Sequence, residues 1–232
     1  MSLLQRLVAE AATQRLAVNR KDGSVLVRVP AGEFEMGEGQ GAHKVRLSEY
    51  WIGVYCVTNR QYGRFVKETG HRPPEEADFG TPIWKGGRCP EERLDHPVVC
   101  VSWEDAKSYA DWAGLSLATE AQWERGARGP LGLLYPWGDG WDADRARHAG
   151  NRGGEETCAA WKFPKGASGF GTYQQSGNVW EWCADRHDYG YVVRGGCWWY
   201  DAPSTLRAAY RLRVDPADRG GDLGFRLART AV

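Results

Sequence analysis

The amino-acid sequence predicts a single α+β domain that is irregular and rich in loops, and three observations support this. The chain has 232 residues, a length typical of one large domain. It contains 12 Trp and 30 Gly, a combination that favours loops held by large, rigid side chains over long regular elements. Beyond residue 130 the apolar residues lose helical or strand periodicity, and short aromatic segments alternate with Gly, Asp and Ser.

The N-terminal residues predict a short amphipathic helix, because apolar side chains recur on one face. Charged residues interrupt the stretch, which therefore lacks the continuous apolar core of a signal peptide. We expect residues 1–21 to form an N-terminal helical extension and residues 22–232 to form the domain. No apolar run approaches the roughly 18–20 residues of a membrane-spanning helix, so we expect a cytoplasmic protein without membrane insertion. The apolar face consists of Leu3, Leu4, Leu7, Val8 and Ala11.

Short strands are predicted in the segment that follows. Val25–Val29 and residues 34–36 flank a Pro-Ala-Gly turn, which indicates a hairpin. Further strands are expected around Val45 and Leu47 and over residues 51–57, the last leading directly into a helix.

Three helices are predicted from the residues at their starts. Two starts are capping boxes, in which a Thr is followed three residues later by Gln. The third is a Ser before two acidic residues, which favour the positive end of the helix dipole. A Gly, which readily adopts positive φ, stands at each expected end. The N-caps are Thr58, Ser102 and Thr119, the ends are Gly70, Gly114 and Gly129, and the inward residues are Tyr62, Phe65, Val66, Ala106, Tyr109 and Ala110.

The net charge and the cysteine spacing argue against several classes of protein function. The chain carries 30 Lys and Arg against 30 Asp and Glu, which argues against nucleic acid as a partner and against a polybasic membrane binder. The cysteines form no Cys-x-x-Cys pair and have no His at ligand spacing, so a zinc site is not expected. We expect buried free thiols, with a catalytic thiol as the alternative. The cysteines are Cys56, Cys89, Cys100, Cys158, Cys183 and Cys197.

Several ordered motifs extend along the chain. They are GEFEMG at 32–37, WIGVYCVT at 51–58, HPVVCVSW at 96–103, LATEAQWE at 117–124, YPWG at 135–138, SGNVWEW at 176–182, RGGCW at 194–198 and LGFR at 223–226. From about residue 22 to 229 this order resembles the formylglycine-generating enzyme, or sulfatase-modifying factor, family. The resemblance implies a variant of the C-type lectin fold, with few helices and small twisted sheets. Several activities share that scaffold, so function must be argued from individual residues.

The first activity that the resemblance suggests is a copper-dependent oxidase. In the family, two cysteines five positions apart bind copper(I) shortly after the RGG-x-W motif. Neither cysteine is present here: Cys197 lies inside the motif, where Ser is usual, and no second cysteine follows it. We therefore expect no copper and no catalytic residue. An enzyme of this family with an unrecognised active site stays as the alternative.

The second activity is that of an iron-dependent sulfoxide synthase of the ergothioneine type. Such enzymes hold iron with three histidines, supplied largely by an additional helical domain. The histidines here are scattered without HxxxH spacing, so we expect no iron. His96 precedes a proline and is expected to serve a turn or a buried hydrogen bond. The full set is His43, His71, His96, His148 and His187.

The third interpretation is a non-catalytic ligand-binding protein. Residues 194–226 resemble the variable region of proteins diversified by retroelements, in which a template is copied with substitutions at adenines, chiefly in Asn codons. Most framework positions of that pattern are retained, including Arg194, Arg211 and Arg226. Trp199 cannot arise from an Asn codon, and ordinary divergence without diversification stays as the alternative.

The expected binding surface joins the positions that are Asn-rich in that pattern with a neighbouring aromatic residue. Its aromatic and aliphatic members are typical of binding hot spots. Adjacent glycines and charged residues favour surface placement. We expect an unidentified ligand, taken to be a protein. The residues are Trp199, Tyr200, Asp201, Thr205, Tyr210, Leu212, Val214, Asp218, Gly220, Gly221 and Asp222.

The resemblance also implies a structural Ca²⁺. In family enzymes calcium is held around the GN-x-WEW motif by a side-chain amide, backbone carbonyls and the Glu, and such oxygen ligands suit Ca²⁺. The matching amide here is a Gln in place of the usual Asn. A second calcium ion would use Asn151 and the Arg152 carbonyl. The matching positions of the first site are Gln174, Gly177, Val179 and Glu181.

Overall fold

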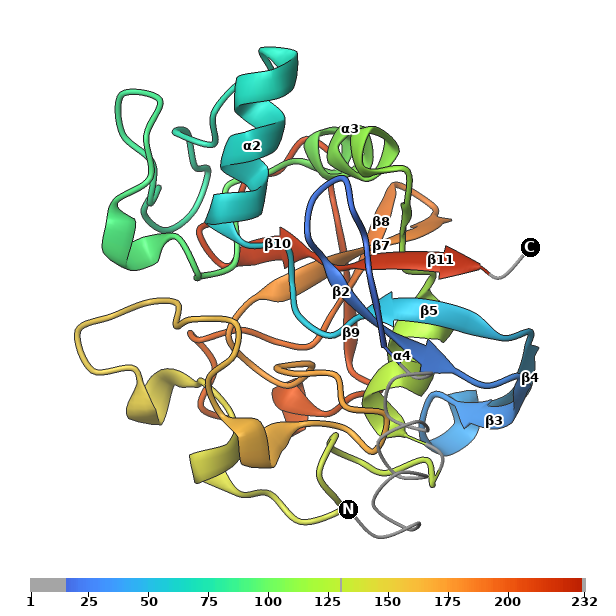
Figure 1. Ribbon diagram of the computed structural model, residues 1–232. Coiled ribbons are helices and arrows are strands. Elements are labelled where there is room, and N and C mark those ends of the chain that lie inside the picture. The colour runs from blue at the N-terminus through green and yellow to red at the C-terminus, as the bar shows by residue number, and fades with distance from the viewer. Residues whose placement is uncertain (1–15, 130, 231–232) are drawn as a thin grey trace, which may run out of the picture.

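The computed structural model describes residues 16–129 and 131–230 (Figure 1). The expected helix over residues 3–11 lies outside these residues. Leu16–Val18, within the predicted helical extension, forms strand β1 instead, and β1 pairs antiparallel with β2 (Val25–Val29). The described end of the extension therefore belongs to the sheet, where pairing with Val25–Val27 satisfies its backbone.

Two sheets organise the domain, and a small hairpin lies beside them. The larger sheet has the order β1-β2-β5-β11-β6, with β5 at Tyr50–Gly53, β6 at Ser116–Leu117 and β11 at Leu227–Thr230. The second sheet has the order β10-β7-β8-β9. Its strands are β7 (Trp180–His187), β8 (Gly190–Arg194), β9 (Arg211–Val214) and β10 (Leu223–Phe225). β11, near the end of the chain, thus lies between β5 and β6 in the sheet that β1 and β2 also form.

The hairpin predicted between residues 25 and 36 is wrong in its pairing. β2 pairs with β5, whereas β3 (Gly32–Met36) pairs with β4 (His43–Leu47) in a separate two-stranded sheet. The strand expected over residues 51–57 ends at Gly53. Tertiary partners select these pairings, and the local turn residues do not encode them.

All three predicted helices are confirmed. They are α2 (Asn59–Thr69), α3 (Trp103–Ala113) and α4 (Glu120–Arg128), and each starts at a capping box. Gly70 and Gly114 adopt left-handed conformations at the ends of α2 and α3. In Figure 1, α2 and α3 lie at one end of the molecule and the loops that follow α4 lie at the opposite end.

Tryptophans of the sequence motifs form much of the core. Trp123 and Trp182 are fully buried, Trp198 is 2% exposed, and Trp51 and Trp137 are half-buried. The indole N–H groups of the first two are paired, with the Glu181 carboxylate and the Val101 carbonyl respectively. Buried indoles therefore fix the loops through packing and through hydrogen bonds. The single irregular α+β domain is confirmed.

Among the described residues between α4 and β7, the helical segments are short 3₁₀ turns at Ala143–Arg145, Ala149–Asn151 and Pro164–Gly166. None of the helices in the described residues combines the length and the apolar character needed to cross a membrane.

Candidate functional site

A buried ion pair anchors the end of the segment 194–226. The Arg226 guanidinium donates to both carboxylate oxygens of Glu181 at 2.9 Å, and neither side chain is exposed. The same guanidinium donates to the Gly53, Val54 and Tyr173 carbonyls at 2.7–2.9 Å. One side chain therefore joins β5, the loop before β7 and the start of β11.

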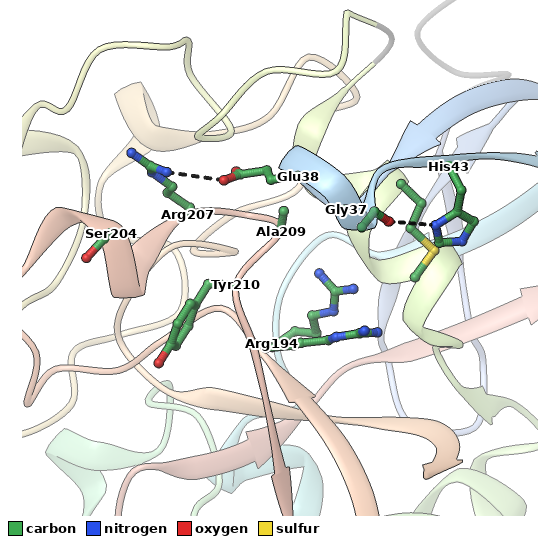
Figure 2. A pocket seen from close by; sticks show the side chains of 11 residues that line it. Gly37, Glu38, His43, Arg194, Ser204, Arg207, Ala209 and Tyr210 are labelled. Carbon is green, nitrogen blue, oxygen red and sulfur yellow. Dashed lines mark hydrogen bonds and ion pairs between the residues drawn. The ribbon is translucent and has the colours of Figure 1, made fainter.

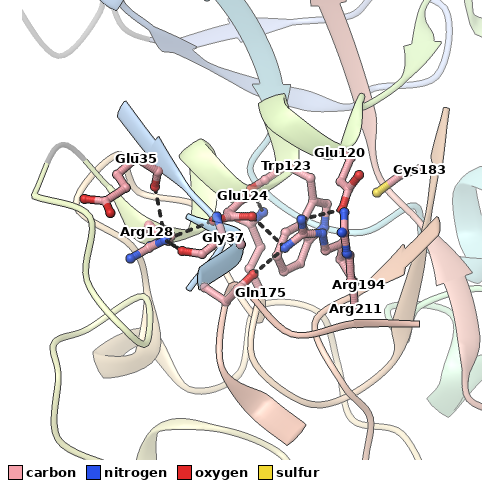
Figure 3. Close-up of polar contacts among 12 residues, drawn as sticks. Glu35, Gly37, Glu120, Trp123, Glu124, Arg128, Gln175, Cys183, Arg194 and Arg211 are labelled. Carbon is pink, nitrogen blue, oxygen red and sulfur yellow. Dashed lines mark hydrogen bonds and ion pairs between the residues drawn. The ribbon is translucent and has the colours of Figure 1, made fainter. Parts of the chain in front are cut away.

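A second buried cluster anchors the beginning of the segment (Figure 3). Arg194, 1% exposed, bridges Glu120 at 2.6 Å and Glu124 at 2.8 Å, both on α4. Arg211 on β9 also reaches Glu120 at 2.6 Å. Burial raises the pKa of Glu120, but the two guanidinium groups outweigh burial and hold that pKa below its usual range. Residues 194–226 are therefore held at both ends by charge-assisted hydrogen bonds.

Side chains of the segment between the two anchors help to line a cavity of about 410 Å³, which we name the aromatic cavity. Its walls come from β7, β8, β9, the loop after β8 and the loop before β10. Four aromatic rings line it, and they belong to Phe79, Trp180, Trp199 and Tyr200. Most of the residues predicted for ligand binding lie on its walls, namely Trp199, Tyr200, Leu212, Val214, Asp218, Gly220 and Asp222.

Six residues that line the cavity were not predicted as ligand-binding from the sequence, namely Asp78, Phe79, Trp180, Val193, Arg219 and Leu223. Asp78 and Phe79 belong to a distant loop, which the backbone of residues 219–221 holds beside the cavity. Asp78 N–H donates to the Arg219 carbonyl at 2.9 Å, and Gly221 N–H donates to the Phe79 carbonyl at 2.6 Å. The only sequence signal was an aromatic residue in a polar loop, and nothing in a single sequence links that loop to residues 219–221.

The remaining predicted residues, Asp201, Thr205, Tyr210 and Gly221, do not line this cavity. Asp201 is exposed, and the Thr205 hydroxyl donates to the Ala202 carbonyl. Gly220 and Gly221 are buried, which contradicts the expected surface placement. A Cβ atom on Gly221 would lie 2.9 Å from the Thr81 nitrogen, so the close approach of the two backbones requires glycine there.

Tyr210 lines a second cavity, of about 380 Å³, on the other side of β9 (Figure 2). Here the Arg207 guanidinium lies 3.2 Å from the Glu38 carboxylate. Figure 2 shows Tyr210 and Arg207 on one side of this cavity and His43 on the other. The charges at this cavity are paired across it, whereas the aromatic cavity is mostly apolar with acidic residues.

The six cysteines are free, and all except the half-buried Cys89 are buried. Burial raises the pKa of the Cys89 and Cys158 thiols to about 11 and that of Cys100 to about 12. Burial likewise raises the pKa of the other three thiols. Copper(I) ligation and nucleophilic attack both require thiolate, so these environments favour the inert, protonated form.

His96 makes the buried hydrogen bond expected from the sequence. Its Nδ1 lies 2.8 Å from the Thr157 hydroxyl. Burial, followed by the nearby Arg93, lowers the pKa of this imidazole to about 4. The ring is therefore neutral at physiological pH and acts as a structural side chain.

Of the four residues expected to hold Ca²⁺, the two that would bind through side chains, Glu181 and Gln174, do not fit the ion in their present arrangement. Both Glu181 oxygens already accept two hydrogen bonds each, from Cys56, Trp123 and Arg226. The Gln174 carbonyl oxygen accepts from Asn178, and its amide donates to the Ala159 and Lys162 carbonyls. A cation at Glu181 would also face the Arg226 guanidinium, so like-charge repulsion disfavours it.

A guanidinium also occupies the place of the second expected calcium ion. Arg147 is 7% exposed and donates to the carbonyls of Asn151, Arg152, Glu155 and Glu156 at 3.0–3.2 Å. The carbonyls of Asn151 and Arg152 thus face an organic cation of the chain itself.

Comparison with known proteins gives a consistent set of similarities. Residues 11–231 match the sulfatase-modifying factor enzyme 1-like domain. The chain is 34% identical to the formylglycine-generating enzyme of Thermomonospora curvata, over 86% of this chain and 78% of that protein. The fold is similar to that of PvdO from Pseudomonas aeruginosa, with a TM-score of 0.75 and 28% identity over 93% of this chain and 98% of the other. Treponema denticola variable protein 1 has a similar fold, with a TM-score of 0.72 and 22% identity over the same shares.

Replacing the buried carboxylate should destabilise the protein strongly. Glu181→Gln leaves the Arg226 charge buried without its partner, which costs about 3–5 kcal/mol of the free energy of unfolding. Asp111→Asn makes the same chemical change in the exposed Lys107–Asp111 pair and should cost below about 0.5 kcal/mol. Urea denaturation of both variants measures the difference, and equal losses would contradict the role given to the buried pair.

Calcium should have no effect on stability. The Glu181 carboxylate, the Gln174 amide oxygen and the carbonyls of Asn151 and Arg152 already accept hydrogen bonds from side chains of the protein, so the melting temperature should be the same with excess Ca²⁺ and with EDTA. Scanning calorimetry of the intact protein measures this. A rise of the melting temperature with Ca²⁺ concentration would show that an ion binds the folded state.

Proposed function

The chain belongs to the family of sulfatase-modifying factor enzyme 1-like domains, and we propose that within this family it is a non-catalytic ligand-binding protein. The observation that supports this most strongly is the aromatic cavity, formed largely by side chains of residues 194–226 between two buried anchors. Its volume, about 410 Å³, falls in the range of roughly 300–1,000 Å³ that is usual for ligand sites.

Exposed aromatic residues at the cavity support binding. Trp199 is 52% exposed and Phe79 is 49% exposed, and their rings meet edge to face with centroids 6.1 Å apart. Large aromatic side chains give contact area at low entropic cost and dominate many interfaces. Exposure of these rings to water is unfavourable in free energy, and a bound ligand that covers them would remove this unfavourable contribution.

The same geometry supports diversification of this surface, which we propose as the origin of its side chains. Framework residues such as Arg194 and Arg226 are buried, whereas Trp199, Asp201 and Asp218 project from loops between them. Substitutions at the projecting positions change the surface without breaking an anchor. A reverse-transcriptase gene and a near-copy of the region encoding residues 194–226, differing only at adenines, would establish diversification, and their absence would refute it.

The alternative is an enzyme of the family, which the 34% identity to a formylglycine-generating enzyme favours. The raised pKa values of all six thiols oppose it. We expect no conversion of a cysteine-containing peptide when the purified protein is incubated with copper and oxygen. Mass spectrometry of the peptide checks this, and a copper-dependent loss of mass matching aldehyde formation would establish the enzyme. We also place the protein in the cytoplasm, where a reducing milieu keeps buried thiols free.

Replacing each of two adjacent tryptophans should have different effects on stability, because Trp198 belongs to the scaffold and Trp199 to the proposed binding surface. Trp198→Ala should cost about 3–5 kcal/mol of the free energy of unfolding, because this ring is buried. Trp199→Ala should change it by less than about 0.5 kcal/mol and should remove one wall of the cavity. Denaturation of both variants measures the contrast. A large loss of stability in Trp199→Ala would assign that ring to the scaffold and contradict the binding role.

A further inference from the structure

The aromatic cavity carries three carboxylates, of Asp78, Asp218 and Asp222. Asp78 and Asp218 are exposed, and Asp222 is half-buried in the wall. Within residues 16–129 and 131–230, no Lys, Arg or His lies within ion-pair distance of any of the three. Arg219 also lines the cavity, but its guanidinium is paired with Asp105 at 3.3 Å. The cavity therefore combines apolar walls with unneutralised negative charge.

Neighbouring groups do not relieve this charge. Asp78 accepts a hydrogen bond from the Arg219 backbone, and Asp222 accepts one from the Cys197 thiol. Burial raises the pKa of Asp222 and of Asp218, and the nearby Asp215 and Asp78 carboxylates raise the latter further. Such shifts report carboxylates that lack a cationic partner.

The aromatic rings supply the second half of the recognition chemistry. The rings of Trp180 and Tyr200 meet edge to face, as do those of Phe79 and Trp199. The Arg152 guanidinium lies 5.3 Å over the ring of Trp199, so this ring already holds a cation of the chain on one face. The rings of Phe79, Trp180 and Tyr200 line the cavity beside it. Aromatic faces combined with carboxylates are the arrangement that recognises organic cations.

A metal ion does not suit the same groups. Across the described part of the chain, no three His, Cys, Asp or Glu side chains come close enough together to hold one. The three carboxylates surround a space of about 410 Å³ and do not converge on one point. That space accepts a charged group together with a stem that covers the apolar wall formed by Leu212 and Val214.

We propose that the aromatic cavity binds an organic cation, an ammonium or guanidinium group carried on an apolar stem, as in a lysine or arginine side chain. This assignment rests on the proposed binding function and names the chemistry of its ligand. Leu212 and Val214 contact the stem, the rings contact the cation, and Asp218 and Asp222 neutralise its charge.

The test titrates the intact protein with the N-acetyl amides of lysine, arginine and norleucine in a calorimeter. Norleucine has a similar stem without the charge. We expect the two cations to bind at least about ten-fold more tightly than norleucine, a difference of roughly 1.4 kcal/mol. A short glycine peptide with one internal lysine distinguishes the sources: tighter binding of the peptide indicates a protein ligand, and tighter binding of the free amide indicates a small molecule.

Matched variants locate the effect. Asp218→Asn should weaken the binding of the lysine amide several-fold and leave the binding of the norleucine amide unchanged. Asp144→Asn removes an exposed carboxylate that does not line the cavity, and it should change the binding of neither amide. Equal affinity for lysine and norleucine amides would overturn the cation assignment while leaving a binding cavity in place. Binding of no probe at millimolar concentration would overturn the assignment as well, whereas the proposed function is judged separately, from the copper assay and the gene neighbourhood.

Discussion

Buried guanidinium groups hold this fold together. In a domain with so little regular structure, many backbone carbonyls have no partner within a helix or sheet and must be satisfied in another way. Arg226 donates to carbonyls of β5 and of the loop before β7, and Arg147 donates to four carbonyls within residues 151–156. Arg194 donates to one more, in the loop before β9. Arginine suits this task because its planar group offers five donors and stays charged when buried. The glutamates of α4 and β7 balance that charge, so the loops depend on these few pairs.

This arrangement separates stability from recognition. The anchors lie at the two ends of residues 194–226, and side chains of the segment between them help to line the aromatic cavity. A side chain that projects into the cavity contacts neither Glu181 nor Glu120, so its replacement leaves the anchoring charges intact. Gly221 marks the limit of this freedom, because the neighbouring backbone at Thr81 leaves no room for a side chain. The surface can therefore vary at particular positions only, and the packing of the backbone decides which.

Local chemistry made the helices and the scaffold predictable from the sequence. Thr58, Ser102 and Thr119 act as N-caps through contacts within four residues, and motif tryptophans such as Trp123 are buried. Contacts between distant segments were not predictable. The pairing of β3 with β4, the loop bearing Asp78 and Phe79, and the burial of Gly220 and Gly221 all depend on tertiary neighbours that a single sequence does not reveal. The cavity walls on the C-terminal segment were predicted, and the opposite wall was missed.

The position of β11 makes completion of the larger sheet depend on an intact reading frame through residues 194–226. β11 follows the binding segment in the chain and lies between β5 and β6 in the larger sheet. A reading-frame error or a stop codon anywhere in residues 194–226 therefore removes a central strand together with Arg226, and the product cannot complete its sheet. Missense changes on the surface pass through synthesis unharmed, whereas truncated chains stay unfolded and are open to proteolysis. Folding of the domain therefore requires that the reading frame stay intact through residues 194–226.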